Sequence, residues 1–102
     1  MRYHVYALKN PKSKSTPYVL DLQSDLLSDM KTRIVAPLRL RSSVDPAEIM
    51  RVLMPVFEIA GQPCVLFPQE MAAYPANLLG AEVADLTAQS SNILNALDRL
   101  LS

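Results

Sequence analysis

The sequence has one cysteine, two glycines and one histidine, and these shortages exclude several classes of protein. A single thiol, Cys64, cannot form a disulfide within the chain, so a small secreted fold held by internal disulfides is excluded. Gly61 and Gly80 cannot together form a glycine loop that cradles phosphates. No group of histidine, cysteine and carboxylate residues has metal-ligand spacing, so we expect neither a metal nor another cofactor.

Long apolar runs are also missing. No stretch reaches the roughly 20 residues that a membrane-spanning helix needs, and the N-terminal segment MRYHVYALKN is too short and too polar for a signal peptide. We therefore expect a cytoplasmic protein without membrane contact. The length predicts a single domain over residues 1–102, and a composition with 50% hydrophobic residues is sufficient for one core.

The net charge of zero conceals an uneven distribution. Residues 1–51 carry nine basic and five acidic side chains, whereas residues 52–102 carry one basic and five acidic side chains. A basic half can attract nucleic acid or an acidic partner, and an ordinary solvated surface is the alternative. The lysines of the segment KNPKSKSTP, residues 9–17, lie in a predicted flexible loop.

Alternating apolar and polar residues predict a series of short strands. Pro37 lacks a backbone donor, which predicts that the third strand lies at a sheet edge or carries a bulge. Between the third and fourth strands, Asp45 and Pro46 predict a capped helical turn. The predicted strands are RYHVYAL, YVLDLQ, TRIVAPLRL, two strands around the turn AGQP, and a short strand near residues 71–74 that could also be a loop.

The last segment, AEVADLTAQSSNILNALDRLLS, predicts an amphipathic helix of about 15 residues with Thr87 as its N-cap. Strands followed by one helix predict a mainly β fold with a C-terminal α-helix, in which the helix packs on a small antiparallel sheet or a partly closed barrel. We expect the helix to contribute to the core as well as to the surface. Its apolar stripe consists of Ile93, Leu94, Leu97, Leu100 and Leu101.

The residues do not point to a catalytic centre, and we expect no enzymatic activity. Metal-free cleavage of RNA is the one enzymatic alternative, because it needs only an acid, a base and a cation near the scissile phosphate. His4, Asp21, Arg33, Arg39 and Arg41 could supply these groups, although their spacing does not single them out.

Four segments in order resemble one known family. VLDLQSDLL resembles the DVQSD strand and the following hydrophobic pair of the CcdB family, the plasmid-addiction toxins that poison DNA gyrase. TRIVAPL is similar to the third strand of that family. The segment from LMPVFEIAG to AAYPANLLG, followed by EVADL and the final helix, is similar to its second half. The resemblance covers nearly the whole chain, with gaps at the basic loop and around residues 41–48.

The resemblance implies a toxin of a type II toxin–antitoxin system. Such toxins are homodimers with an SH3-like barrel and a C-terminal helix, a fold that they share with the Kid and MazF toxins. They bind the A subunit of DNA gyrase and trap the complex of gyrase with cleaved DNA. A CcdA-like antitoxin releases gyrase through a disordered tail, and the toxin–antitoxin complex represses its own operon, so operator DNA is reached only through that complex.

The resemblance also assigns candidate contact residues. The lysines of the basic loop are the preferred antitoxin contacts, because antitoxin tails in this family tend to be acidic and lysines attract them over long range. A solvated loop is the alternative for the lysines, and a place in the core is the alternative for the leucines. The candidate gyrase-binding residues are Ser24, Leu26, Leu27, Asn95, Asp98, Leu101 and Ser102, and the candidate antitoxin-binding residues are Lys9, Lys12 and Lys14.

The family pattern continues beyond the helix with a bulky residue and a terminal Gly-Ile. Ser102 stands at the position of the bulky residue, and the Gly-Ile is missing. A large apolar anchor contributes about 2–4 kcal/mol to an interface, so we expect weakened gyrase poisoning. Two alternatives follow: a non-toxic homologue that still binds the antitoxin, and a MazF/Kid-like endoribonuclease with Arg33, Arg39 and Arg41 along an RNA groove.

Overall fold

The computed structural model describes residues 1–11, 14–27 and 29–102. Its strands are β1 (His4–Leu8), β2 (Tyr18–Asp21), β3 (Thr32–Leu40), β4 (Val56–Ile59), β5 (Gln62–Leu66), β6 (Ala72–Pro75) and β7 (Leu79–Asp85). The described residues contain one α-helix, α1 (Ser90–Leu101), which is 12 residues long.

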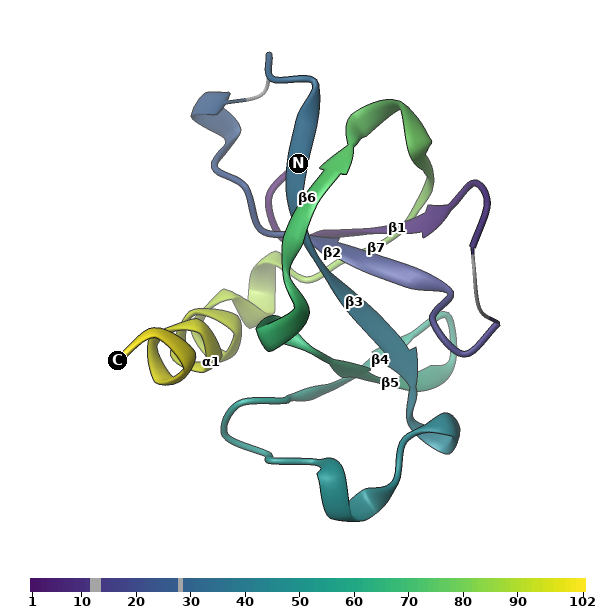
Figure 1. The fold of residues 1–102 in the computed structure, drawn as a ribbon, viewed down its shortest axis with the longest axis vertical. Helices are drawn as coiled ribbons and strands as arrows, with labels where there is room; N and C mark the ends of the chain where they lie inside the picture. The colour runs from purple at the N-terminus through teal and green to yellow at the C-terminus, as the bar shows by residue number, and fades with distance from the viewer. Residues whose placement is uncertain (12–13, 28) are drawn as a thin grey trace.

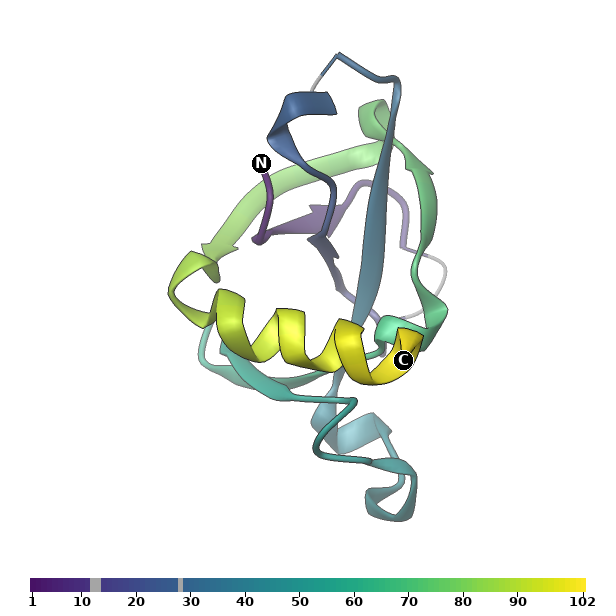
Figure 2. The same cartoon turned by 90° about the vertical axis from the view of Figure 1, so that its left-hand side faces the viewer.

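The strands form one antiparallel sheet in the order β4-β5-β3-β2-β1-β7, and β6 also pairs with β3. Figures 1 and 2 show that the sheet curls strongly into a half-barrel and that α1 lies along one side of it. The predicted mainly β fold with a C-terminal helix is therefore confirmed. No helix within the described residues is both long enough and apolar enough to cross a membrane.

Short turns of 3-10 helix connect the strands. One of them confirms the predicted turn at Asp45, whose carboxylate accepts a hydrogen bond of 3.0 Å from the backbone N–H of Ala47. The six turns are η1 (Asp25–Leu27), η2 (Arg41–Ser43), η3 (Pro46–Glu48), η4 (Pro68–Glu70), η5 (Ala76–Leu78) and η6 (Thr87–Gln89).

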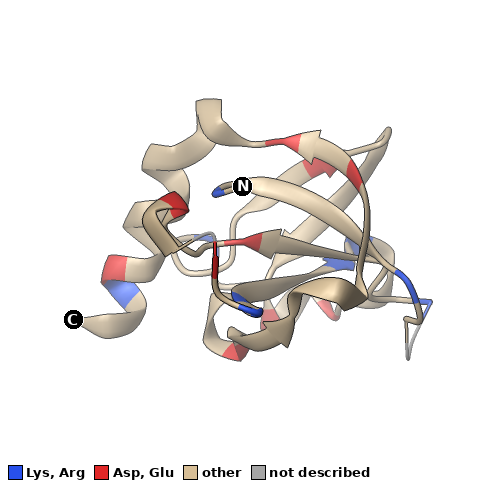
Figure 3. Cartoon of the chain, turned by 90° about the horizontal axis from the view of Figure 1, so that it is seen from above, with Lys and Arg blue, Asp and Glu red and all other residues tan. Residues whose placement is uncertain are grey.

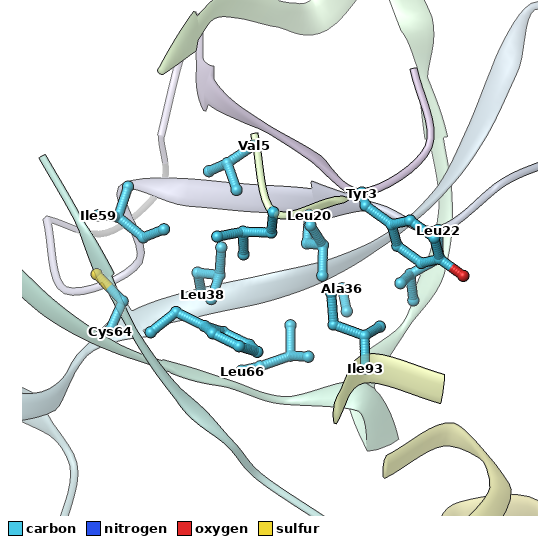
Figure 4. Close-up of a cluster of buried hydrophobic side chains, with 12 residues drawn as sticks. Tyr3, Val5, Leu20, Leu22, Ala36, Leu38, Ile59, Cys64, Leu66 and Ile93 are labelled. Carbon is cyan, nitrogen blue, oxygen red and sulfur yellow. The ribbon is translucent and has the colours of Figure 1, made fainter. Parts of the chain in front are cut away.

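The main core fills the inside of the curled sheet (Figure 4). Val5 lies opposite Leu20, and Leu20 lies opposite Ala36, so β1, β2 and β3 place these three side chains side by side. Ile93 of α1 belongs to the same buried cluster, and all four side chains have no solvent exposure. Since burying a large aliphatic side chain contributes about 1.5–3 kcal/mol, this cluster fixes the helix on the sheet.

The predicted edge position of β3 is wrong. β3 pairs with β2 on one side and with both β5 and β6 on the other. The β5 register covers Leu38–Leu40 and the β6 register covers Thr32–Val35, so Pro37 falls between the two partner strands. The carbonyl of Pro37 accepts a hydrogen bond of 3.0 Å from the N–H of Phe67 on that side. Proline has no N–H to donate, and at this junction between β5 and β6 no partner strand requires a donor from Pro37.

The helix differs from its prediction in two ways. It begins at Ser90 after the turn η6, and Thr87 is not its N-cap. Leu94, which was expected in the core, is 41% exposed, whereas Ala96 is fully buried. The buried side of α1 therefore runs through Ile93 and Ala96, three residues apart, and not through the adjacent pair Ile93 and Leu94.

A second, smaller core lies below the main one. Its buried residues are Val44, Met54, Val65 and Phe67, with Ile49 and Leu53 packed against them. This cluster holds the long connection over residues 41–55 against β5, below α1 in Figure 2.

Candidate functional site

The turn after β2 rests on a buried ion pair. Asp21, the last residue of β2, is 1% exposed, and Arg33 of β3 is 7% exposed. The Nε atom of Arg33 donates to Oδ2 of Asp21 at 2.9 Å, and a second guanidinium nitrogen lies 2.8 Å from the same oxygen. Buried charges are tolerated only when they are paired and hydrogen-bonded. The pair therefore fixes the point at which the chain leaves the sheet.

Gln23 extends this support into the turn itself. Its backbone N–H donates to Asp21 at 3.0 Å, and its side-chain Oε1 accepts from the N–H of Ile34 at 2.9 Å. Its Nε2 donates to the carbonyl of Leu27 at 3.1 Å. The Ser24 hydroxyl accepts from the N–H of Leu26 at 3.2 Å. Gln23 thus ties the C-terminal end of η1 to β3, and Ser24 stabilises its first turn.

The turn that these polar contacts hold in place exposes apolar side chains to solvent. Leu26 is 95% exposed and Leu27 is 49% exposed, so the alternative that they belong to the core is wrong. Met30 is 50% exposed and Ile34 is 37% exposed. A large apolar group held outward on a fixed turn is typical of an interaction surface rather than of chance exposure. We refer to Ser24, Leu26, Leu27, Met30 and Ile34 as the turn patch.

The candidate residues on α1 also face solvent. Asn95, Asp98 and Ser102 are exposed, and Leu101 is 72% exposed. Ser102 completes the helix end, because its N–H donates to the carbonyl of Asp98 at 2.9 Å. These four residues, which we call the helix patch, lie away from the buried residues Ile93 and Ala96.

The two patches lie on the same side of the molecule. Figure 1 shows the turn and α1 on its left-hand side, and Figure 2 views that side directly. No hydrogen bond or ion pair joins them within the described residues. Their contact with gyrase stays a prediction, but one partner surface can face both.

The basic loop lies far from α1. Lys9 and Lys14 are exposed, and Nζ of Lys9 donates to the carbonyl of Asn77 at 2.8 Å. Lys12 lies outside the described residues. Figures 1 and 3 show this loop at the opposite end of the molecule from the C-terminus. The candidate antitoxin contacts and the helix patch can therefore be occupied by different segments of a partner.

The residues of the RNA-cleavage alternative are not brought into one open site. Arg33 is buried against Asp21, and Arg39 pairs with Glu70 and stacks on the ring of Phe67 at 4.3 Å. Arg41, by contrast, is exposed and free of ion pairs among the described residues. The described part of the chain also lacks a cluster of three or more side chains able to hold a metal ion.

His4 is held between two carboxylates of β7. Its Nδ1 lies 2.6 Å from Glu82 and its Nε2 lies 3.4 Å from Asp85. Asp85 in turn accepts hydrogen bonds from the hydroxyl and the N–H of Thr87, which lower the pKa of Asp85 below its usual value, with the nearby His4 acting in the same direction. These contacts fix β7 to β1 and lead the chain into η6, which is a structural role.

The supporting residues of the turn patch were not recognised from the sequence. Arg33 was considered only as a cation for RNA, and Gln23 was not considered. The signal that could have identified them is an arginine inside an apolar strand, opposite an aspartate that ends the neighbouring strand, since such a pair favours a buried ion pair.

The family model described as CcdB protein matches residues 2–102. The match spans all seven strands, the turn patch and the helix patch.

Proposed function

This chain belongs to the CcdB family of type II toxin–antitoxin toxins, and from this premise we propose that it binds the A subunit of DNA gyrase and traps gyrase on cleaved DNA. The action is stoichiometric: the protein contributes a binding surface and no chemistry of its own. The cleavage step belongs to gyrase.

The main structural support for this proposal is the exposed turn patch. Leu26 projects almost completely into solvent from a turn that the Asp21–Arg33 pair and Gln23 hold in place. A preorganised apolar anchor loses little conformational entropy when it binds, so most of its burial energy contributes to affinity. The helix patch adds Leu101 as a second apolar anchor, with Asn95 and Asp98 as polar groups around it.

We further propose that the active species is a homodimer, as in the family. Two copies would present two turn patches and two helix patches, which raises affinity for a target that offers paired sites. A CcdA-like antitoxin would release the target, with Lys9 and Lys14 among its first contacts, and the complex of both proteins would repress their operon.

A second candidate is a homologue that binds the antitoxin without poisoning gyrase. The observation that favours it is Ser102, a small exposed residue at the position where the family pattern has a bulky one. Replacing Ser102 with Phe would then increase gyrase poisoning, whereas an unchanged level would remove this explanation.

A plasmid cleavage assay tests the proposal. Gyrase, supercoiled plasmid and the purified protein are incubated with ATP, and linear DNA is measured after detergent and protease treatment. We expect linear DNA to accumulate with the wild type and to fall about tenfold or more with a Leu26→Ser, Leu27→Ser double variant. Val83→Ser, the same kind of change at an exposed apolar residue on β7, is the control.

Two outcomes would contradict the proposal. The first is the absence of linear DNA at micromolar wild-type protein. The second is degradation of bulk RNA by the protein in the absence of gyrase, because that would assign it a catalytic activity.

A further inference from the structure

The turn patch contains one side chain that an oxidant can change chemically. Met30 follows η1, and its backbone N–H donates to the carbonyl of Leu27 at 3.1 Å. Met30 is 50% exposed and Leu27 is 49% exposed. The thioether of Met30 is therefore held at the surface as part of the same apolar patch as Leu26 and Leu27.

Three other sulfur atoms are shielded in or against the two cores. Cys64 has no solvent exposure, Met54 is 2% exposed, and Met71 packs partly buried against the main core. Burial also raises the pKa of the Cys64 thiol, so little of this residue is present as the reactive thiolate. Mild oxidation therefore reaches the surface thioethers before it reaches the sulfur atoms of the cores.

Two further methionines are exposed but do not belong to the turn patch. Met1 is 62% exposed and Met50 is 63% exposed. Met50 lies in the connection between β3 and β4, and it is at least as open to solvent as Met30. It therefore provides a matched comparison, in which a thioether is accessible to an oxidant but is not a candidate contact with the target.

Oxidation converts this apolar side chain into a polar one. In the reaction with hydrogen peroxide, a lone pair of the Met30 sulfur attacks one peroxide oxygen, the O–O bond breaks and an S–O bond forms. The sulfur loses two electrons and the peroxide gains them. The departing hydroxide takes the proton from the transferred oxygen and leaves as water. The product, methionine sulfoxide, has a polar S–O group in place of the thioether.

We propose that Met30 is a reversible oxidation site that controls the contact of the turn patch with the A subunit of gyrase. The inference rests on the proposed function, because it assigns a form of regulation to the same surface. With Met30 reduced, the patch is apolar and binds. With Met30 oxidised, the S–O group has to lose its water to enter an apolar interface, and burial of an unpaired polar group is unfavourable.

The fold itself tolerates this change. Met30 is half exposed, and its hydrogen bond to Leu27 joins backbone atoms that oxidation of the sulfur does not alter. The contacts that hold the turn come from Asp21, Gln23 and Arg33, whose side chains contain no sulfur. Oxidation of Met30 should therefore weaken binding without lowering the stability of the protein.

Binding to the isolated gyrase A subunit before and after peroxide treatment tests this inference. The protein is treated with hydrogen peroxide until peptide mass mapping shows that Met30 has been converted to the sulfoxide. We expect the treated wild type to bind at least about tenfold more weakly than the untreated protein, with an unchanged thermal melt. Incubation with methionine sulfoxide reductases for both sulfoxide epimers, together with their thiol reductant, should restore the affinity.

Two variants locate the effect, each compared with its own untreated form. Met30→Leu lacks the sulfur atom, so its affinity for gyrase A should be the same before and after peroxide treatment. Met50→Leu removes an exposed thioether outside the patch, and peroxide should weaken this variant as much as it weakens the wild type. Met30→Gln places a polar group of similar length in the patch and should bind weakly without any oxidant.

Three results would overturn the inference. The first is equal affinity of the untreated protein and the protein oxidised at Met30, which would leave the proposed function intact. The second is a loss of affinity on treatment that persists in Met30→Leu, because another residue would then be responsible. The third is conversion of Met50 while Met30 stays reduced. Absence of binding by the untreated protein would contradict the proposed function and this inference together.

Discussion

Asp21 and Arg33 show how two residues can determine a surface without being part of it. Their pairing is almost completely buried, and Gln23 extends it to the carbonyl of Leu27. The sequence indicated that Asp21 stands at the end of a strand, but it could not show that Arg33 lies opposite. Strand register determines which residues face each other, and register depends on the whole sheet.

Replacing Arg33 with Met should lower the free energy of unfolding by about 3 kcal/mol. The buried carboxylate of Asp21 would lose its buried partner and keep only the exposed N-terminal ammonium of Met1, 3.1 Å away, as a cation. Urea denaturation measures this loss. Arg39→Met is the matched control: Arg39 is 34% exposed at its side chain and pairs with the exposed Glu70, so its replacement should cost about 1 kcal/mol or less. Equal losses in the two variants would show that the Asp21–Arg33 pair has no special role.

Asp85 predicts a dependence of stability on pH. Hydrogen bonds from Thr87 lower the pKa of Asp85 below 3.8 in the folded state. Its stabilising contribution is therefore complete above pH 3.8 and is lost as the pH falls through the lower folded pKa. We therefore expect the wild type to have a higher free energy of unfolding than Asp85→Ala at neutral pH. This difference should shrink as the pH falls through that acidic range.

Thr87→Val serves as the control for this effect, since it removes one of the two hydrogen bonds and should reduce the pH-dependent difference. A difference between wild type and Asp85→Ala that is constant from pH 7 down to pH 2 would contradict the assignment.

At the scale of elements, the strands with strict alternation were predicted well. β1, β2 and β3 appear within a few residues of their predicted bounds. β7 was not recognised, because most of its residues are exposed and none of them is fully buried, so no apolar core face marks the strand. Its position comes from tertiary pairing with β1, which local sequence does not encode.

Gly80 illustrates the close approach of β7 to β1. A Cβ atom at this position would lie 2.8 Å from the carbonyl oxygen of Ala7. Gly80→Ala should therefore shift the two strands apart and lower the unfolding free energy by about 1–3 kcal/mol, which thermal denaturation can measure. Ala81→Ser, at the exposed neighbouring position, should change it by less than about 0.5 kcal/mol. A neutral Gly80→Ala variant would be inconsistent with this close pairing.

In the helix α1, two adjacent apolar residues differ strongly in burial: Ile93 is fully buried and Leu94 is exposed. Ile93→Ala should lower the unfolding free energy by about 2–5 kcal/mol, because it leaves a cavity in the main core. Leu94→Ala, at the next residue, should cost less than about 1 kcal/mol, since the side chain is 41% exposed. Similar losses for both variants in chemical denaturation would mean that the helix packs differently.

At the scale of the whole molecule, the candidate contact regions lie in different places on the surface. The turn patch and the helix patch share one side, and the basic loop lies at the far end. The sequence and its family resemblance predicted the fold and the exposed turn. The hollow lined by Arg41, Arg51, Asn92 and Asn95 was not predicted, because its walls come from segments about 40 residues apart that only the folded chain brings together.

The most direct test of the account is the affinity of the protein for the isolated gyrase A subunit, measured by titration calorimetry. We expect saturable binding in the micromolar range or tighter, a loss of tenfold or more in a Leu26→Ser, Leu101→Ser variant, and no change in Lys14→Ser. The absence of binding, or equal affinity for the wild type and the double leucine variant, would contradict the claim that this protein acts through its exposed turn and helix.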